Sequence, residues 1–383
     1  MRHLPRRWPS AIIAGLLALG GAGAVPAVAA AHATHGSYVY VDDNTAGTNT
    51  VAAFSRQADG HLTPVAGSPF NAGGAGTGSG LASQGAIQVT SDRRYVLAVD
   101  AGSNQISVLR IEHHGALRLV GDGVVASGGV EPVSVAEHNG LVYVANAGPG
   151  GSNYTGFTLN ASGWLRPLAR STVTLPDSAQ PGDVLFNSTG TNLVGTRVGT
   201  SLIDSFSVGS NGRLTGAPDS PFSAQGPGPF GSKFRPTNPS QLFVSNAHGG
   251  TANGTVSAFS VASDGTLSSI GSSPFADNQT APCWLEIAPD GQFLFTVNTA
   301  SGSIARYSIA SDGTLTLLGS TPVSSESGVG AVDARLSTDG ATLYVDESHV
   351  DAVGEFAVNG GQLTEVGSVA LPAGATPAGV AAK

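Results

Sequence analysis

Short runs of alternating apolar and polar residues, each bounded by a turn, follow one another along almost the whole chain. One such group contains apolar or alternating segments at residues 284–287, 293–297, 304–309 and 315–318. Asp-Gly at 312–313 separates the last two segments, and both residues tolerate the positive φ of a tight hairpin turn. Period-two alternation over four to seven residues is typical of half-buried strands. The group therefore predicts four consecutive antiparallel strands.

A turn of the form polar-Gly-x-Leu repeats down the chain and defines the architecture. Its leucines are Leu62, Leu117, Leu165, Leu214, Leu267, Leu315 and Leu363. These residues divide the chain into seven units of about 50 residues each. Seven consecutive four-stranded units of this length predict an all-β fold, a seven-bladed β-propeller with four antiparallel strands in each blade.

The two ends of the repeated region complement each other. The first unit begins with a second-strand pattern at residues 38–41, and the chain finishes with a first-strand pattern at residues 377–382. We therefore expect the C-terminal strand to close the first blade, which would cover two exposed sheet edges. Residues 34–383 are accordingly predicted to form a single propeller domain.

Residues 1–33 are predicted to be a signal peptide. Arg2, Arg6 and Arg7 precede an apolar stretch at residues 11–28, and small residues suited to cleavage follow. The predicted mature protein is secreted or extracytoplasmic and has no membrane span. Removing three arginines and no acidic residue changes the formal net charge from −9 to −12. The single cysteine, Cys283, can form neither an internal disulfide nor a cysteine-based zinc site.

Composition excludes several classes of partner. Only 11% of the residues are charged, and no basic block is present, so the chain lacks the electrostatic pattern of a nucleic-acid-binding protein. The Gly-rich stretch at residues 71–85 is not a phosphate-binding loop, because no Lys-Ser/Thr follows it. We interpret that stretch as a mobile loop between the first two blades, with a lid as its functional interpretation. The alanine-rich, lysine-poor composition is typical of a bacterial protein.

The strand-two patterns at residues 141–146 and 242–246, together with the Pro-Asp-Gly turn at 289–291, carry a resemblance to a known family. The chain resembles the seven-bladed lactonase-like propellers, which include bacterial 6-phosphogluconolactonases, carboxymuconate-cyclising enzymes and propellers with YVTN-type repeats. The resemblance implies a small-molecule ligand, a lactone or sugar acid, at the mouth of the central channel. It also implies a carboxylic ester hydrolase or a cycloisomerase if the protein is catalytic, with no cofactor.

The family's His, Arg and Glu residues are not found at the corresponding positions. Gly182 and Asp183 stand in the segment that resembles the family's Pro-His-x-His sequence. Phe230 and Gly231 stand in the segment that resembles Gly-Pro-Arg-His, and Ala247 replaces the Glu after strand two. The lactonase mechanism therefore does not transfer residue by residue.

Charged residues on the predicted innermost strands are the first candidate site. The aligned position in successive blades holds Gln88, Val135, Leu185, Lys233, Glu286, Arg335 and Ala381. Lys233 and Arg335 are expected to bind a carboxylate, and Glu286 and Asp333 to act as catalytic proton-transfer groups. Trp284 is expected to stack on the ligand. The alternative is a structural ion-pair network between blades.

A second set of candidates stands at the ends of the second strands: Asp43, Asp100, Asn146, Arg197, Asn246, Asn298 and Glu347. The Asn and Asp members are expected to hydrogen-bond the backbone of the following turn. Arg197 and Glu347 are too long for that role and are candidate substrate-binding residues, as are His248 and His349 in neighbouring loops. No metal site is predicted.

Two functions follow. The first is a secreted lactonase-like propeller that hydrolyses or forms a small lactone at the channel mouth. The second is a non-catalytic extracellular propeller that binds a ligand or a cell-surface partner. For either function, the protein is expected to be a monomer.

Overall fold

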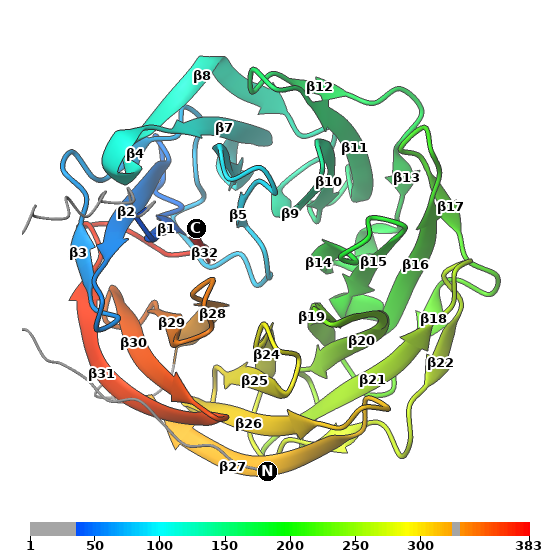
Figure 1. Ribbon diagram of the computed structural model, residues 1–383. Coiled ribbons are helices and arrows are strands. Elements are labelled where there is room, and N and C mark those ends of the chain that lie inside the picture. The colour runs from blue at the N-terminus through cyan, green and yellow to red at the C-terminus, as the bar shows by residue number, and fades with distance from the viewer. Residues whose placement is uncertain (1–35, 324–329) are drawn as a thin grey trace, which may run out of the picture. The chain divides into compact units, whose positions relative to one another are not determined.

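The computed structural model describes residues 36–323 and 330–383 of the chain. The predicted signal peptide, residues 1–33, lies outside the described residues. The rest forms seven antiparallel sheets arranged as blades around a central axis, so the predicted seven-bladed β-propeller is confirmed (Figure 1). No helix within residues 36–323 and 330–383 is long and apolar enough to cross a membrane.

Each blade contains the predicted four strands in order, and blades 1, 3, 4 and 5 add a short fifth strand that pairs with the third strand of the blade. Blades 1 to 3 contain β1 (Tyr38–Asp42), β2 (Thr50–Arg56), β3 (Leu62–Pro64), β4 (Phe70–Asn71); β5 (Ile87–Val89), β6 (Tyr95–Asp100), β7 (Gln105–Ile111), β8 (Leu117–Ala126); and β9 (Pro132–His138), β10 (Leu141–Asn146), β11 (Asn153–Leu159), β12 (Leu165–Pro167), β13 (Val173–Thr174). Blades 4 and 5 contain β14 (Pro181–Phe186), β15 (Asn192–Arg197), β16 (Leu202–Val208), β17 (Leu214–Gly216), β18 (Phe222–Ser223); and β19 (Pro229–Arg235), β20 (Asn238–Asn246), β21 (Thr255–Val261), β22 (Leu267–Ser269), β23 (Phe275–Ala276). Blades 6 and 7 contain β24 (Pro282–Ile287), β25 (Phe293–Asn298), β26 (Ser303–Ile309), β27 (Leu315–Pro322); and β28 (Ala331–Leu336), β29 (Thr342–Glu347), β30 (Ala352–Asn359), β31 (Gln362–Ala370). The remaining elements are the closing strand β32 (Gly379–Ala382) and the short 3₁₀ helices η1 (Ala101–Ser103), η2 (His113–Gly115), η3 (Asp177–Ala179) and η4 (Val198–Thr200).

The repeated polar-Gly-x-Leu motif forms the turn between the third and fourth strands of a blade. In blade 5 the carboxylate of Asp264 accepts the backbone N–H of Thr266 at 2.9 Å, and Gly265 adopts a φ of +90°. A residue with a side chain rarely adopts that φ, so glycine is favoured there. The leucine that follows, Leu267, is buried against the blade. The motif thus combines a turn with a core anchor.

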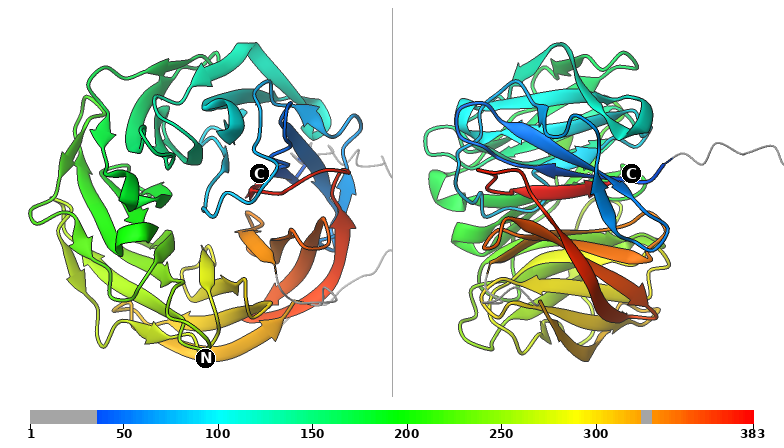
Figure 2. Two further views of the ribbon diagram at one scale, coloured as in Figure 1. Left: turned by 180° about the vertical axis from the view of Figure 1, so that it is seen from behind. Right: turned by 90° about the vertical axis from the view of Figure 1, so that its left-hand side faces the viewer.

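The C-terminal strand closes the ring as expected. β32 pairs with β1, with Tyr40 opposite Ala381, so the first blade reads β3-β2-β1-β32 from the outside inwards. Figure 1 shows β32 beside β1, and Figure 2 shows the same arrangement from behind. On the outer side, the buried Glu355 of blade 7 accepts the backbone N–H of Leu62 at 2.7 Å and contacts His61 Nδ1 at 2.6 Å. Blades 7 and 1 are therefore joined at both their inner and outer strands.

The hydrophobic core lies between adjacent blades, and tyrosines of the second strands cross it. Tyr143 of blade 3 is fully buried and donates its hydroxyl to the carbonyl of Gly212 in blade 4 at 2.9 Å. Tyr344 of blade 7 makes the same contact with Gly60 of blade 1, also at 2.9 Å. Each hydroxyl thus reaches the glycine turn of the next blade, which explains how a buried phenol remains satisfied.

Strand pairing corrects one aligned position on the innermost strands. In blade 6 Glu286 lies opposite Phe295, the third residue of β25. The corresponding third residue of β10 is Tyr143, and its partner is Ala136. Ala136, and not Val135, therefore occupies the level of Glu286 in blade 3. The sequence alignment was wrong by one residue because neither a charged residue nor a glycine marks this position in β9.

Candidate functional site

A segment between the first two blades crosses the mouth of the channel, meaning the end at which the innermost strands begin (Figure 1). We call this segment, residues 80–85, the plug. The backbone N–H of Gln84 donates to the carbonyl of Gly182 on β14 at 2.8 Å. The Gln84 side chain donates to the carbonyl of Ser232 on β19 at 2.9 Å and accepts the N–H of Leu285 on β24 at 2.8 Å. One buried glutamine therefore joins three blades.

The neighbouring residue of the plug extends this network. Ser83 donates its hydroxyl to the carbonyl of Val133 in blade 3 at 2.7 Å, and its own carbonyl accepts the indole N–H of Trp284 in blade 6 at 2.7 Å. Ser83 and Gln84 are both buried. The interpretation of this stretch as a mobile lid is therefore wrong for the plug, because hydrogen bonds to blades 3 to 6 hold it in place. Glycine content alone did not reveal these partners.

Below the plug, three charged side chains meet across blades 5, 6 and 7. Lys233 Nζ lies 2.7 Å from Glu286 Oε1, and Arg335 Nη1 lies 3.3 Å from the same oxygen. The side chains are 13%, 7% and 23% exposed for Lys233, Glu286 and Arg335, respectively. Burial would lower the pKa of Arg335, but the nearby carboxylates, Glu286 foremost, raise it above its ordinary value. We call these three residues the channel triad; the structure brings them together as the sequence pattern predicts.

Two aspartates lie one step nearer the mouth and connect adjacent blades. Asp183 of blade 4 accepts the N–H and the hydroxyl of Ser232 in blade 5 at 2.9 and 2.6 Å. Asp333 of blade 7 accepts the N–H of Val380 on the closing strand at 3.0 Å. Burial raises the pKa of each aspartate to about 6, although hydrogen bonds and the cations of the triad act in the opposite direction. Each carboxyl therefore accepts a backbone N–H of a neighbouring blade.

A pocket of about 330 Å³ lies on the outer side of the plug, and we call it the mouth pocket. Its walls include Trp284, Phe230 and residues 80–83 of the plug, and they are largely apolar. Trp284 and Phe230 meet edge to face, with ring centroids 5.1 Å apart. The polar side chains at the pocket are the hydroxyl of Ser83, which is bonded to Val133, the Cys283 thiol and the Thr299 hydroxyl beside that thiol. Burial raises the pKa of Cys283 to about 11, so the thiol is neutral.

The positions at which the resemblance implies His, Arg and Glu lie around the channel mouth. Phe230 forms a wall of the mouth pocket, and Ala247 belongs to the same buried cluster as Phe230 and Trp284. Gly182 contributes its carbonyl to the plug. Small and apolar groups thus occupy the positions at which the resemblance implies His, Arg and Glu.

Arg197 and Asn246, at the ends of the second strands, pair within their own blades. Arg197 makes a two-pronged ion pair with the buried Asp204 of β16, with Nε 2.6 Å from Oδ2. Asn246 donates to the hydroxyls of Thr255 and Ser257 on β21, at 3.0 and 2.8 Å. The expected contact with the backbone of the next turn is replaced by contacts with third-strand side chains, because the antiparallel pair places those side chains alongside.

Buried carboxyls gather where blade 7 meets blade 1. Neither carboxyl oxygen of the fully buried Asp346 has a hydrogen-bond partner among the described residues. Burial, followed by repulsion from Asp333, Asp43, Asp42 and Glu347, raises its pKa well above the ordinary value. Burial also raises the pKa of Asp43 and of Glu347 to about 7. These carboxyls therefore hold protons at a mildly acidic pH, and Glu347 is part of this group.

His248 and His349 lie exposed on loops of blades 5 and 7. No contact between them is found in the described part of the chain. Within residues 36–323 and 330–383, no group of three or more His, Cys, Asp or Glu side chains is arranged to hold a metal ion. The two histidines are thus placed at the surface and apart from the channel triad.

Comparison with known proteins adds a family and a set of similar folds. The family described as "Lactonase, 7-bladed beta-propeller" matches residues 30–174 and 193–378. Curated protein sequences give no significant match. Among solved structures, a Bacteroides uniformis protein with a provisional 6-phosphogluconolactonase assignment is 19% identical, with a TM-score of 0.74, over 91% of this chain and 99% of its own. The periplasmic gluconolactonase of Pseudomonas aeruginosa is 16% identical, with a TM-score of 0.68, over 90% of this chain and 98% of its own. At these identities the structures demonstrate a shared fold.

Proposed function

Because this chain belongs to the lactonase family of seven-bladed β-propellers, we propose that it binds a small neutral lactone in the mouth pocket. The observation that carries the proposal is the pocket itself, about 330 Å³ in volume, formed where the plug meets Trp284. That volume lies near the lower end of the range for small-molecule sites, about 300–1,000 Å³. A single ring of lactone size is suited to it.

The chemistry of the walls favours a lactone over its open acid. The rings of Trp284 and Phe230 provide an apolar surface for a ring face. The Thr299 hydroxyl, which has only the Cys283 thiol beside it, can donate to an ester carbonyl. The described lining contains no Lys or Arg, so a carboxylate would enter without a countercharge. We therefore expect a neutral lactone to bind more tightly than the corresponding hydroxy acid.

Binding without turnover is the better-supported form of this proposal. Hydrolysis needs a group that accepts a proton from water as it attacks the carbonyl. Cys283 is a neutral thiol with a pKa of about 11. Glu286 is paired with Lys233 and Arg335, on the far side of the plug from the pocket. The described lining therefore offers no base beside the ligand.

Lactone hydrolysis is the second candidate, and one observation favours it. Burial raises the pKa of Asp333 to about 6, beside Arg335, which makes this carboxylate a suitable proton acceptor near neutral pH. A lactone would have to pass the plug to reach it. Water would then add to the carbonyl, Asp333 would take the proton, and the ring oxygen would leave as the alcohol of a hydroxy acid.

Calorimetric titration with glucono-δ-lactone, γ-butyrolactone and sodium gluconate tests both candidates, with hydrolysis followed in parallel by pH-stat. We expect lactone binding that is weakened about fivefold by Thr299→Val, since the change removes one hydrogen bond and little volume. Thr215→Val, on the exposed outer strand β17, is the matched control and should bind as the parent does. Binding of gluconate alone would overturn the neutral-lactone proposal. Turnover abolished by Asp333→Asn in a folded protein would establish the second candidate instead.

Export is a separate proposal that rests on residues 1–33. We propose that the chain is secreted and that a mature protein beginning near residue 34 carries the ligand site outside the cytoplasm. The signal-like order of arginines, apolar residues and small residues supports this proposal. Expression of the full chain in a bacterial host, followed by mass spectrometry of the medium and cell fractions, tests it. An intact N-terminus in the cytoplasmic fraction would contradict it.

A further inference from the structure

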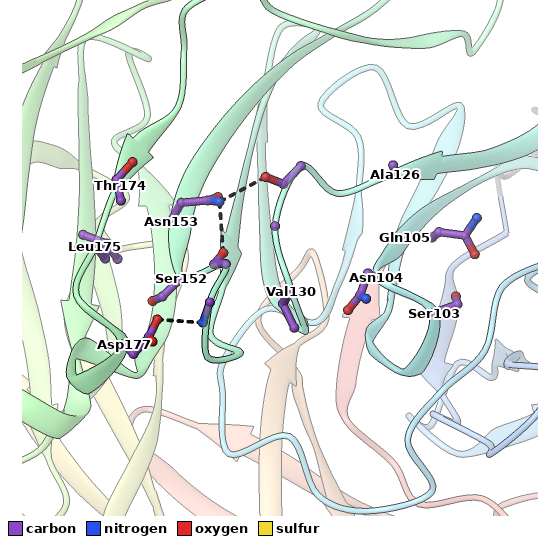
Figure 3. A pocket seen from close by; sticks show the side chains of 14 residues that line it. Ser103, Asn104, Gln105, Ala126, Val130, Ser152, Asn153, Thr174, Leu175 and Asp177 are labelled. Carbon is purple, nitrogen blue, oxygen red and sulfur yellow. Dashed lines mark hydrogen bonds between the residues drawn. The ribbon is translucent and has the colours of Figure 1, made fainter.

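A second and larger cavity lies between blades 2 and 3, and we call it the blade 2/3 groove. Its volume is about 700 Å³, within the range of ligand sites. Figure 3 shows its two walls, with Ser103, Asn104 and Gln105 on one side and Ser152, Thr174 and Asp177 on the other. Val130 lies between them on the loop that leads into β9. The groove and the mouth pocket share no lining residue.

One buried polar group of this groove has no protein partner among the described residues. The hydroxyl of Ser152 is buried, with only 3% of the residue exposed, and forms no hydrogen bond among the described residues. An unsatisfied buried hydroxyl costs free energy, and a ligand or water that bonds to it recovers that cost. Gln105 belongs to the opposite wall, as Figure 3 shows. The groove therefore offers donors and acceptors on both sides.

Other side chains hold the walls in a fixed arrangement. Asp177 accepts the backbone N–H of Gly150 at 2.9 Å through one carboxyl oxygen, which leaves the second oxygen for another donor. Asn153 donates to the carbonyls of Gly128 and Gly151, both at 3.0 Å. Figure 3 draws these bonds, and the bond to Gly128 joins Asn153 to the loop that leads into β9. The loops that form the groove are thus pre-organised, which lowers the entropy cost of binding.

The chemistry of the lining selects among ligand classes. The lining includes amides, hydroxyls, backbone groups and the carboxylate of Asp177, and it contains no Lys, Arg or His. A phosphate or carboxylate would meet Asp177 without a countercharge. Hydroxyl groups, in contrast, both donate to a carboxylate and accept from an amide. The groove therefore suits a neutral molecule with many hydroxyls.

We propose that the blade 2/3 groove binds a neutral oligosaccharide, with its hydroxyls bonded to Ser152, Gln105 and Asp177. This proposal does not depend on lactone binding, because the two cavities lie on different blades. A protein with both sites would hold a polysaccharide fragment at blades 2 and 3 while the mouth pocket takes a small lactone.

Calorimetric titration with maltotriose, cellotriose and N,N′,N″-triacetylchitotriose tests the proposal on the intact propeller. We expect at least one trisaccharide to bind, with Gln105→Ala and Ser152→Ala each weakening binding about fivefold for the loss of one hydrogen bond. Thr174→Trp should abolish binding, since it places a large side chain into the groove from the exposed strand β13. Gln292→Ala, at an exposed turn of blade 6, is the matched control.

Two results would overturn the proposal. One is the absence of binding for all three trisaccharides at about 10 mM, a concentration that would detect even a millimolar dissociation constant. The other is trisaccharide binding that survives Thr174→Trp, which would place the sugar elsewhere. Thermal unfolding of each variant confirms that the propeller is intact, and glucono-δ-lactone binding, scored separately, reports on the mouth pocket alone.

Discussion

Replacing Glu286 by glutamine tests whether the channel triad holds the blades together. The substitution keeps the shape of the side chain and removes its charge. Lys233 Nζ, now 2.7 Å from a carboxylate oxygen, and Arg335 Nη1, 3.3 Å from the same oxygen, would be left as two cations without their shared anion. Both are mostly buried, so water can compensate only in part.

The expected loss follows from these contacts. Breaking a buried ion pair by removing one partner costs about 3–5 kcal/mol, and the remaining solvent exposure of Lys233 and Arg335 favours the lower end, about 3 kcal/mol. The folded unit spans Gly36–Lys383. For about 350 residues, the entropy of unfolding is about 0.7 kcal/mol per kelvin, so Tm should fall by about 4 °C.

Differential scanning calorimetry at pH 7 measures this shift. Glu112→Gln is the matched control, since the Glu112–Arg118 pair is 2.9 Å long but largely exposed at 36% and 62%. An exposed pair contributes about 0–1 kcal/mol, which predicts a shift of about 1 °C or less. If Glu286→Gln unfolds at the parent's Tm, the structural role of the triad is refuted.

A second variant separates the charges from the packing. Replacing Lys233, Glu286 and Arg335 together by methionine removes all three charges and leaves none unpaired. Such replacements are often neutral or stabilising by about 1–4 kcal/mol. We therefore expect the triple variant to be at least as stable as the parent while Glu286→Gln is less stable.

Three further predictions concern closure, pH and the single thiol. Deleting residues 376–383 removes β32 and should abolish cooperative unfolding by calorimetry; an unchanged Tm would contradict closure by this strand. The free energy of unfolding should fall as pH rises from about 4 to about 7. Burial raises the pKa of Asp43 and Glu347 to about 7 and raises that of Asp346 well above its ordinary value. In this pH range the folded chain therefore holds protons that the unfolded chain has released. Asp346→Asn, measured by urea unfolding, should flatten this dependence, and an unchanged slope would exclude Asp346 as a cause. Cys283, buried with a pKa of about 11, should react with 5,5′-dithiobis(2-nitrobenzoate) at least about 100-fold faster in urea than in the native protein, and equal rates would contradict its burial.

The fold was predictable because the same local turn pattern recurs in each of the seven repeat units. Each polar-Gly-x-Leu turn combines a glycine conformation, a polar group that bonds the turn and a leucine anchor, as at Asp264, Gly265 and Leu267. A single short strand can be assigned wrongly from its sequence, but seven copies of the same pattern make the assignment of the repeat secure. Where a strand lacked such a landmark, as in β9, the alignment was wrong by one residue and placed Val135 where Ala136 stands.

The candidate site was predictable only in part. Lys233, Glu286 and Arg335 were found because charges at one repeat position of adjacent blades must lie close together, and the ion pairs confirm their proximity. The partners of Arg197 and Asn246 were missed because the same antiparallel register brings third-strand residues, Asp204 and Thr255, alongside them. Neither the plug nor the groove between blades 2 and 3 left a signal in the repeat.

The sequence by itself thus determined the blade count, the closing strand and the level at which charges meet, since all three depend on periodicity and local turns. The tertiary structure decided where the non-repeating parts lie. Gln84 belongs to a glycine-rich stretch with no pattern, yet its contacts with Gly182, Ser232 and Leu285 close the channel mouth. Such contacts join residues that are about a hundred to two hundred positions apart, and only the folded ring brings those positions together.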